Sequence, residues 1–92
     1  MIKSWKHKGI KNFFETGNAK GIQAKHINKL RIQLNLLDAA TNPKDLNLPG
    51  YGFHELVGDR KGCYSIKVNG NWRLTFSFEK TDAILVNYED YH

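Results

Sequence analysis

The sequence ends in "NYEDYH", residues 87–92, which gathers acidic, phenolic and imidazole groups on its last positions. In an extended chain Asp90 and His92 share one side, while Tyr91 points to the other. A carboxylate beside an imidazole favours the imidazolium form, and a histidine that exchanges protons near neutral pH suits general acid–base catalysis. The alternative is a solvated charged tail, which is the usual state of a chain end.

This tail follows a predicted strand without a linker. Residues 83–88 read "AILVNY", and Ile84, Leu85 and Val86 would be apolar on both sides of a sheet. Such a run is typical of a central strand. A central strand would hold the tail in place, so this continuity favours a structured acid–base site over a solvated end.

Two further candidates lie outside the tail. His54 follows a long loop, where a histidine either transfers protons or ties the loop by a hydrogen bond. Arg73 lies in the predicted strand "WRLTFSF", either as a bidentate phosphate ligand or as half of a cross-strand ion pair. Both residues therefore have a functional and a structural interpretation.

The chain shows no pattern typical of a metal site. None of its four histidines, nor the lone Cys63, lies in a close pair such as H-x-x-x-H or C-x-x-C. No glycine-rich phosphate loop precedes a predicted helix. We therefore expect neither a metal nor a cofactor.

Hydrophobic spacing predicts two helices followed by a group of strands. After a short strand at residues 2–5, helices are expected at 7–17 and 23–40. The longer helix has one apolar stripe: Ile27, Leu30, Leu34 and Leu37. Gln33 lies off this stripe, among the polar positions.

A loop with two prolines separates the helices from four more strands, expected at residues 53–57, 63–68, 72–78 and 83–88. Strands gathered after helices indicate the α+β class. We expect one domain over residues 1–92, with two N-terminal helices on one face of a mainly antiparallel twisted sheet.

One hairpin can be assigned a register, because a buried face requires its apolar residues to lie together. A two-residue turn at Asn69-Gly70 would mix apolar and polar side chains on both faces. A three-residue loop makes one face wholly apolar by pairing Val68 with Trp72, Ile66 with Leu74 and Tyr64 with Phe76. We expect this register, with Asn71 in the left-handed region. The other face is then polar and cationic, and we expect the acid–base groups of the tail to face it.

The net charge of +5 is unevenly distributed. Residues 1–31 carry eight basic residues and one acidic residue, whereas residues 32–92 have a net charge of −2. A basic segment on a small domain indicates a polyanion partner, although it also describes a solvated helix face. Three of its members are candidate RNA contacts: Lys25, Lys29 and Arg31.

The sequence also bears on location. No apolar run approaches the ~20 residues of a membrane span. The basic N-terminal residues have no apolar region of a secretory signal behind them, and Cys63 has no disulfide partner. We expect a cytoplasmic protein without a membrane partner.

Several segments together resemble the HigB group of toxins in the RelE/ParE superfamily, the growth-inhibiting halves of bacterial toxin–antitoxin pairs. The resemblance covers essentially the whole chain and is carried by "MIKSWKHKG", "HELVGDRKGCYSI", "NWRLTF" and "NYEDYH". It implies a fold like that of microbial ribonucleases and an mRNA endoribonuclease that cuts message in the ribosomal A site. The implied reaction needs no metal: the ribose 2′-hydroxyl attacks the adjacent phosphate and leaves a 2′,3′-cyclic phosphate and a 5′-hydroxyl.

The resemblance also implies partners, namely the 70S ribosome with its mRNA and an antitoxin with a helix-turn-helix domain. Through that antitoxin the complex would bind its operator DNA. Some relatives of the same fold instead bind DNA gyrase and cleave no RNA, but they lack the terminal acid–base set. A third possibility is a basic module that acts only by occupying RNA.

Carried onto this chain, the family's site falls on His54, Asp90, Tyr91 and His92, with Arg73 as the phosphate contact. One of His54 or Asp90 would take the 2′-hydroxyl proton. His92 would protonate the leaving oxygen or exchange roles with its neighbour, and Tyr91 would stack on a base or position the phosphate. Lys67 would assist Arg73.

One position departs from the family's pattern. Relatives carry lysine before the "GDR" turn, where this chain has Val57. A cationic contact with phosphate or the ribosome is then either absent from this chain or supplied by Arg60 or Lys61.

Overall fold

The computed structural model describes residues 1–91, which form a small α+β domain, as expected. The helices are α1 (Lys8–Thr16) and α2 (Ile27–Ala39), and three single 3-10 turns are η1 (Ala24–His26), η2 (Pro43–Leu46) and η3 (Gly58–Arg60). The strands are β1 (His54–Glu55), β2 (Cys63–Asn69), β3 (Trp72–Glu79) and β4 (Asp82–Asp90). They form one antiparallel sheet in the order β1-β2-β3-β4. His92 lies outside the described residues.

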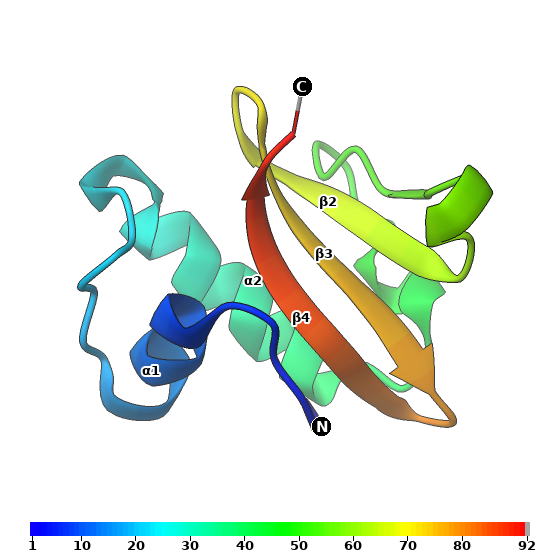
Figure 1. The fold of residues 1–92 in the computed structure, drawn as a ribbon, viewed down its shortest axis with the longest axis horizontal. Helices are drawn as coiled ribbons and strands as arrows, with labels where there is room; N and C mark the ends of the chain where they lie inside the picture. Colours follow the sequence, from blue (N-terminus) through cyan, green and yellow to red (C-terminus); the bar gives the residue numbers. More distant parts are fainter. Residues whose placement is uncertain (92) are drawn as a thin grey trace.

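The helices cover one face of this sheet. In Figure 1 α2 lies behind the sheet and α1 lies next to it on the β4 side. The core between these layers consists of apolar residues from both: Ile10, Phe13, Leu30, Leu34, Leu37, Ile66, Val68, Leu74, Phe76, Val86 and Tyr88. No helix in residues 1–91 is long and apolar enough to cross a membrane.

One residue that lies off the apolar stripe of the long helix is nevertheless buried. Gln33 is fully buried, and its Nε2 donates a hydrogen bond to the carbonyl oxygen of Lys67 at 2.9 Å. That carbonyl lies next to a bulge in β2, where regular strand pairing is interrupted. The amide of Gln33 therefore satisfies a backbone group that the neighbouring strand does not.

The predicted hairpin register is right over most of its length. Ile66 pairs with Leu74 and Tyr64 pairs with Phe76, but Asn69, rather than Val68, pairs with Trp72. The bulge between Lys67 and Asn69 takes up the extra residue and keeps the apolar side chains on one face. Gly70 has the positive φ of 58°, so the expectation for Asn71 was wrong. Glycine adopts that conformation without steric cost.

The position of β4 also differs from the expected central strand. It is the last strand in the sheet order, and its outer edge is covered by the N-terminal segment. Ile2 and Trp5 form isolated parallel bridges to Ala83 and Val86, in place of the short strand predicted at residues 2–5. Both edges of β4 are therefore hydrogen-bonded, which removes the exposed edge that a terminal strand would present.

A second bulge lies within β4. Thr75 pairs with Asn87 while Ser77 pairs with Ile84, so β4 has one residue more than β3 between these pairs. Leu85 takes a left-handed φ of 55° here, and its N–H is bonded to the Ser4 hydroxyl at 2.9 Å. One inserted residue reverses the alternation of side chains beyond it. This bulge decides which tail residues face the helices.

The strand predicted at residues 53–57 is reduced to two residues. His54 pairs with Ser65 and Glu55 pairs with Tyr64, and the chain then enters the turn that contains η3. The short strand still places His54 beside the polar face of β2.

Candidate active site

The sheet face turned away from the helices carries two rows of polar side chains. Residues that pair across an antiparallel sheet share a face, so the register alone places them together. One row runs through His54, Ser65, Thr75 and Asn87, and the next through Lys67, Arg73 and Glu89. We refer to these two rows as the polar face.

Arg73 occupies the middle of the polar face. Its Nη1 donates to the Ser65 hydroxyl at 2.9 Å and to the carbonyl oxygen of Gly52 at 3.1 Å. Both acceptors are neutral oxygens, and none of the salt bridges among residues 1–91 includes Arg73. The cross-strand ion pair is therefore not formed in this region, and the guanidinium keeps its charge available for an anion.

Gly52 is a residue of this site that sequence reasoning missed. It has a positive φ of 56°, and a Cβ added there would lie 3.5 Å from Arg73 Nη2. Its carbonyl oxygen also lies 3.2 Å from Nδ1 of His54. One backbone carbonyl thus contacts both candidate residues. Two prolines and two glycines in this loop were a signal for an unusual backbone, but not for this contact.

The contact with Gly52 fixes the proton on the His54 ring. A carbonyl can only accept, so Nδ1 must be the nitrogen that carries hydrogen. In the neutral ring Nε2 then has a free lone pair. The side chain is exposed. The loop-tying interpretation and the proton-transfer interpretation of His54 are therefore compatible.

Glu89 anchors the tail on the polar face. Its carboxylate accepts two hydrogen bonds from Arg60, at 3.1 and 2.5 Å, and one from the Thr75 hydroxyl at 2.6 Å. The Arg60 bonds hold the pKa of Glu89 below its usual range, and Glu89 in turn raises the pKa of Arg60. Arg60 was expected to contact RNA, but here it is first of all the partner of Glu89.

Asp90 lies on the other side of the strand. It pairs in register with Trp72, whose neighbours Leu74 and Phe76 belong to the core face. The expectation that this carboxylate faces the surface around Arg73 was therefore wrong, because the bulge at Leu85 shifts the alternation. Glu89 takes that place instead.

Tyr91 continues the chain toward the polar face. Its N–H donates to the carbonyl oxygen of Asn71 at 2.7 Å, which extends the strand pairing past the end of β4. Its side chain is 40% exposed and contributes electrostatically to the raised pKa of Arg60. Tyr91 is thus held close to the polar face, whereas the predicted position of His92 lies outside the described residues.

The remaining predicted cations divide into two groups. Lys67 and Lys61 are exposed, and Lys67 lies directly beside Arg73 in the register. Lys25, Lys29 and Arg31 are exposed on η1 and α2, the helical layer that covers the opposite face. Arg31 donates to the Asn28 side chain at 3.1 Å and lies 5.8 Å over the Phe13 ring. The structure does not bring this second group to the polar face.

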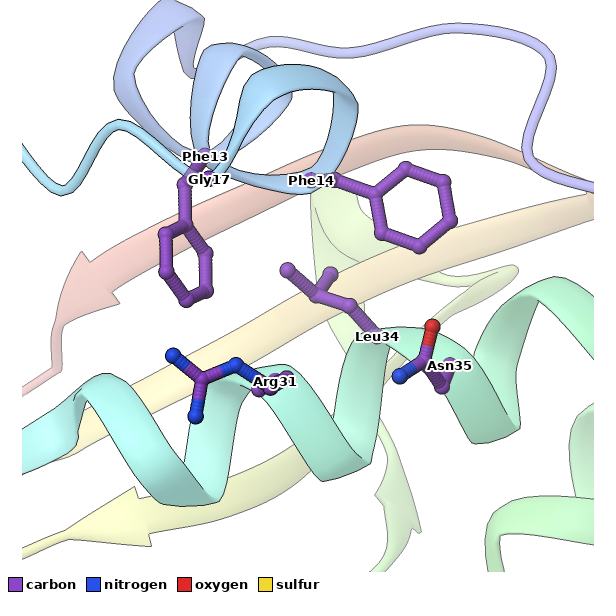
Figure 2. Close-up of a pocket in the computed structure, with 6 residues that line it drawn as sticks. All are labelled: Phe13, Phe14, Gly17, Arg31, Leu34 and Asn35. Carbon is purple, nitrogen blue, oxygen red and sulfur yellow. The ribbon is translucent and has the colours of Figure 1, made fainter.

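A cavity of about 200 Å³ lies away from the polar face. Figure 2 shows Phe13 pointing from α1 toward α2 and Phe14 extending to the side, with Leu34 of α2 between the two rings. The residues that line this cavity all come from α1, the residue that ends it, and α2. The cavity therefore contains none of the predicted catalytic residues. Within residues 1–91 no three His, Cys, Asp or Glu side chains are grouped to bind a metal ion.

Comparison with known proteins places the chain in a family. Residues 3–92 match the model of the HigB-like toxins, described as RelE-like toxins of type II toxin–antitoxin systems. The chain is 48% identical over 92 residues to the Endoribonuclease HigB of Proteus vulgaris, with both chains fully covered. It is 36% identical over 95 residues to Toxin HigB-1 of Vibrio cholerae serotype O1, covering 100% of this chain and 98% of that protein.

A solved structure supports the fold. The crystal structure of a YafQ mutant from E. coli superposes with a TM-score of 0.57 at 19% identity, over 96% of this chain and 91% of that one. From the match along nearly its whole length and the two close relatives, the chain belongs to the HigB-like family of RelE-like toxins, the toxin halves of type II toxin–antitoxin pairs, and an antitoxin is its expected partner.

Proposed function

We propose that this protein is an endoribonuclease that cleaves mRNA in the ribosomal A site and thereby stops translation and growth. Its relative from Proteus vulgaris bears the name of an endoribonuclease. The observation in the structure that supports the proposal most is the pair of exposed His54 and half-buried Arg73, joined by the Gly52 carbonyl. Attack of the ribose 2′-hydroxyl on the adjacent phosphate requires a general base next to a group that binds the phosphate.

The first step falls to His54. With its proton on Nδ1, the ring takes the 2′-hydroxyl proton on Nε2 as the 2′-oxygen attacks phosphorus. The bond from phosphorus to the 5′-oxygen then breaks, leaving a 2′,3′-cyclic phosphate and a 5′-hydroxyl. Asp90 is the weaker candidate for the base, because the register places it on the opposite face.

Arg73 stabilises the phosphate in this reaction. Its Nη1 is held by Ser65 and Gly52, and the guanidinium meets the additional negative charge of the pentacovalent phosphorus. Lys67, beside it in the register, adds a second positive charge. Tyr91 stacks on a neighbouring base or positions the phosphate. His92 protonates the departing 5′-oxygen. No step requires a metal ion.

The ribosome supplies the positioning that so small a site lacks. The exposed Lys25, Lys29 and Arg31 dock on ribosomal RNA, on the side of the molecule away from the polar face. Changing all three to glutamate weakens ribosome binding and lowers the slope of log affinity against log salt by about 0.7–0.9 per lost phosphate contact. Unchanged binding would exclude this docking surface.

A helix-turn-helix antitoxin neutralises the toxin in the cytoplasm, and the pair binds its operator through the antitoxin. Mapping transcript 5′ ends after brief induction, with and without active translation, tests the function. We expect new 5′-hydroxyl ends within reading frames only when ribosomes translate. Growth arrest without such ends would favour a toxin that binds a protein such as gyrase.

Removing His92 tests the role of the tail. The truncated chain should fold but lose toxicity, because the 5′-oxygen would leave without a proton donor. Full toxicity of the truncated chain would contradict the nuclease mechanism.

A further inference from the structure

A cluster of four aromatic rings lies on the helix side of the sheet, beneath the end of β4. His26 of η1, Trp72 of β3 and Tyr88 of β4 meet pairwise, with ring centroids 4.5–5.8 Å apart. His7 adds an edge contact to Tyr88 at 5.4 Å. We refer to these four residues as the ring cluster. None of them takes part in the proposed reaction.

His26 is the unusual member of the ring cluster. It is only 1% exposed, and its Nδ1 lies 2.6 Å from the Tyr88 hydroxyl. Its Nε2 is buried and has no hydrogen-bond partner among residues 1–91. Burial of a polar atom without a partner costs free energy, so an apolar residue would make a simpler core here. The buried imidazole therefore indicates a role other than filling space.

The surroundings favour the uncharged forms of His26 and Tyr88, the two groups that share the hydrogen bond. Burial lowers the pKa of His26, and the neighbouring Lys25 and Lys29 lower it further. Burial raises the pKa of Tyr88, although a hydrogen bond from the Gln23 backbone opposes this change. The hydrogen between the two groups is carried either by the Tyr88 hydroxyl or by Nδ1 of His26. A neutral acceptor and a neutral donor therefore meet in the core.

The ring cluster includes residues of β4, which leads into the tail, and of β3, which pairs with the end of β4. Tyr88 precedes Asp90 by two residues, and Trp72 is the register partner of Asp90. The carbonyl of Asn71, next to Trp72, accepts the Tyr91 N–H. A displacement of the Tyr88 ring or the Trp72 ring toward or away from the sheet would therefore move the backbone at Asp90 and Tyr91.

We propose that His26 is a positioning residue: through the Tyr88 hydroxyl and the Trp72 ring it fixes where the end of β4 presents Asp90 and Tyr91. This inference rests on the proposed function for its catalytic consequence, but not for its structural one. His26 touches no reacting atom, and it acts through the strand end alone.

Amide hydrogen exchange at Tyr91 tests the structural part directly. We expect His26→Leu to speed exchange at Tyr91 about tenfold or more relative to amides in the middle of β3, because the strand end opens locally. His26→Asn keeps a polar atom near the position of Nδ1 and should restore much of the protection. Tyr88→Phe, which removes one hydroxyl, should resemble His26→Leu and serves where that variant fails to fold.

Cleavage on programmed ribosomes tests the catalytic part. His26→Leu should lower kcat about ten- to a hundredfold with little change in KM, since small displacements of positioned groups cost rate. The matched control is Leu37→Ala, fully buried near the other end of α2. It should lower Tm yet leave kcat and the relative exchange at Tyr91 unchanged.

The outcomes separate the two proposals. Unchanged Tyr91 exchange and kcat in both His26→Leu and Tyr88→Phe would overturn the positioning role. Equal losses in Leu37→Ala would also overturn it, because general destabilisation would then explain the effect. If the unaltered protein cleaves no RNA, the proposed function fails, and the exchange data still decide whether His26 holds the strand end.

Discussion

The C-terminal end of β4 is held by different interactions on the two faces of the sheet. Glu89 faces the polar face and is held by charge, through Arg60 and the Thr75 hydroxyl. Its neighbour Tyr88 faces the helices, is 4% exposed, and is held by packing and one neutral hydrogen bond. Adjacent residues thus connect the same strand end to two unrelated kinds of support.

The difference shows how the fold can present a charged site from a well-packed strand. The helix side carries the packing, so the polar face need not be filled. Arg73 can therefore keep neutral partners there, and its charge remains available for an anion. The two sides should respond differently to substitution, salt and pH, and the predictions below depend on that difference.

The largest expected effect is on the polar face. Arg73→Lys keeps the positive charge but loses the planar group that bonds Ser65 and Gly52 and that contacts phosphate in the proposed mechanism. We expect the cleavage rate to fall by about 10²-fold or more, with little change in stability. The rate on programmed ribosomes and the urea midpoint measure these two effects. A fully active Lys variant would mean that a simple charge is enough.

The next effect concerns the carboxylate that anchors the tail. Glu89→Ala removes the partner of Arg60 and Thr75 and should lower the free energy of unfolding by about 1–3 kcal/mol. Arg60 is partly exposed and regains water, so the loss should be below that of a fully buried pair. Glu79→Ala, exposed at the far end of β3, is the matched control.

High salt should affect the stability of the charged side and the packed side differently. The destabilisation caused by Glu89→Ala should shrink in high salt, whereas that of Tyr88→Phe should not, because screening acts on charges and not on packing. Denaturant unfolding at two salt concentrations gives both values. Equal salt dependence would show that the two sides are not distinct.

The two sides should also lose their support at different pH. His26 and His7 have a lowered pKa in the folded protein, so the unfolded chain binds protons first. The contribution of these histidines to the free energy of unfolding is therefore fully present above about pH 6.5. It falls as the pH drops toward their pKa values in the folded protein. Glu89 has a lowered pKa too, but its contribution is lost only below about pH 4.3.

Unfolding between about pH 7.5 and 5.5 isolates the histidines. His26→Asn should flatten the decline in this range, while Glu89→Gln should leave it unchanged. Besides Lys25 and Lys29, the groups that face His26 are the Tyr88 hydroxyl and, behind it, His7. The same decline in His26→Asn as in the unaltered protein would assign the effect to His7 or elsewhere.

The smallest effect compares the two hairpins. Each has a positive φ at the first turn residue, Gly70 near the site and Lys80 at the far end of the sheet, and both φ values are 58°. Lys80→Gly should raise stability by about 0.5–1 kcal/mol, because glycine adopts this conformation freely. Cleavage and Tyr91 exchange should stay unchanged, and a lower Tm would contradict the assignment of strain to Lys80.

The sequence contained enough to predict the α+β class, the two helices, the end of α1 at Gly17 and most of the hairpin register. These features follow from local spacing and from the need to bury one face, so neighbouring residues determine them. The motifs also indicated the toxin family, and they singled out His54 and Arg73.

Other features depended on contacts between distant segments. The burial of His26 and Gln33, the Gly52 carbonyl between His54 and Arg73, and the N-terminal cover of β4 arise only when the chain is folded. The folded sheet also determines that Glu89, and not Asp90, lies on the polar face. A single inserted residue at Leu85 reverses the side of every later side chain, and bonds between β4, β3 and Ser4 hold that insertion in place.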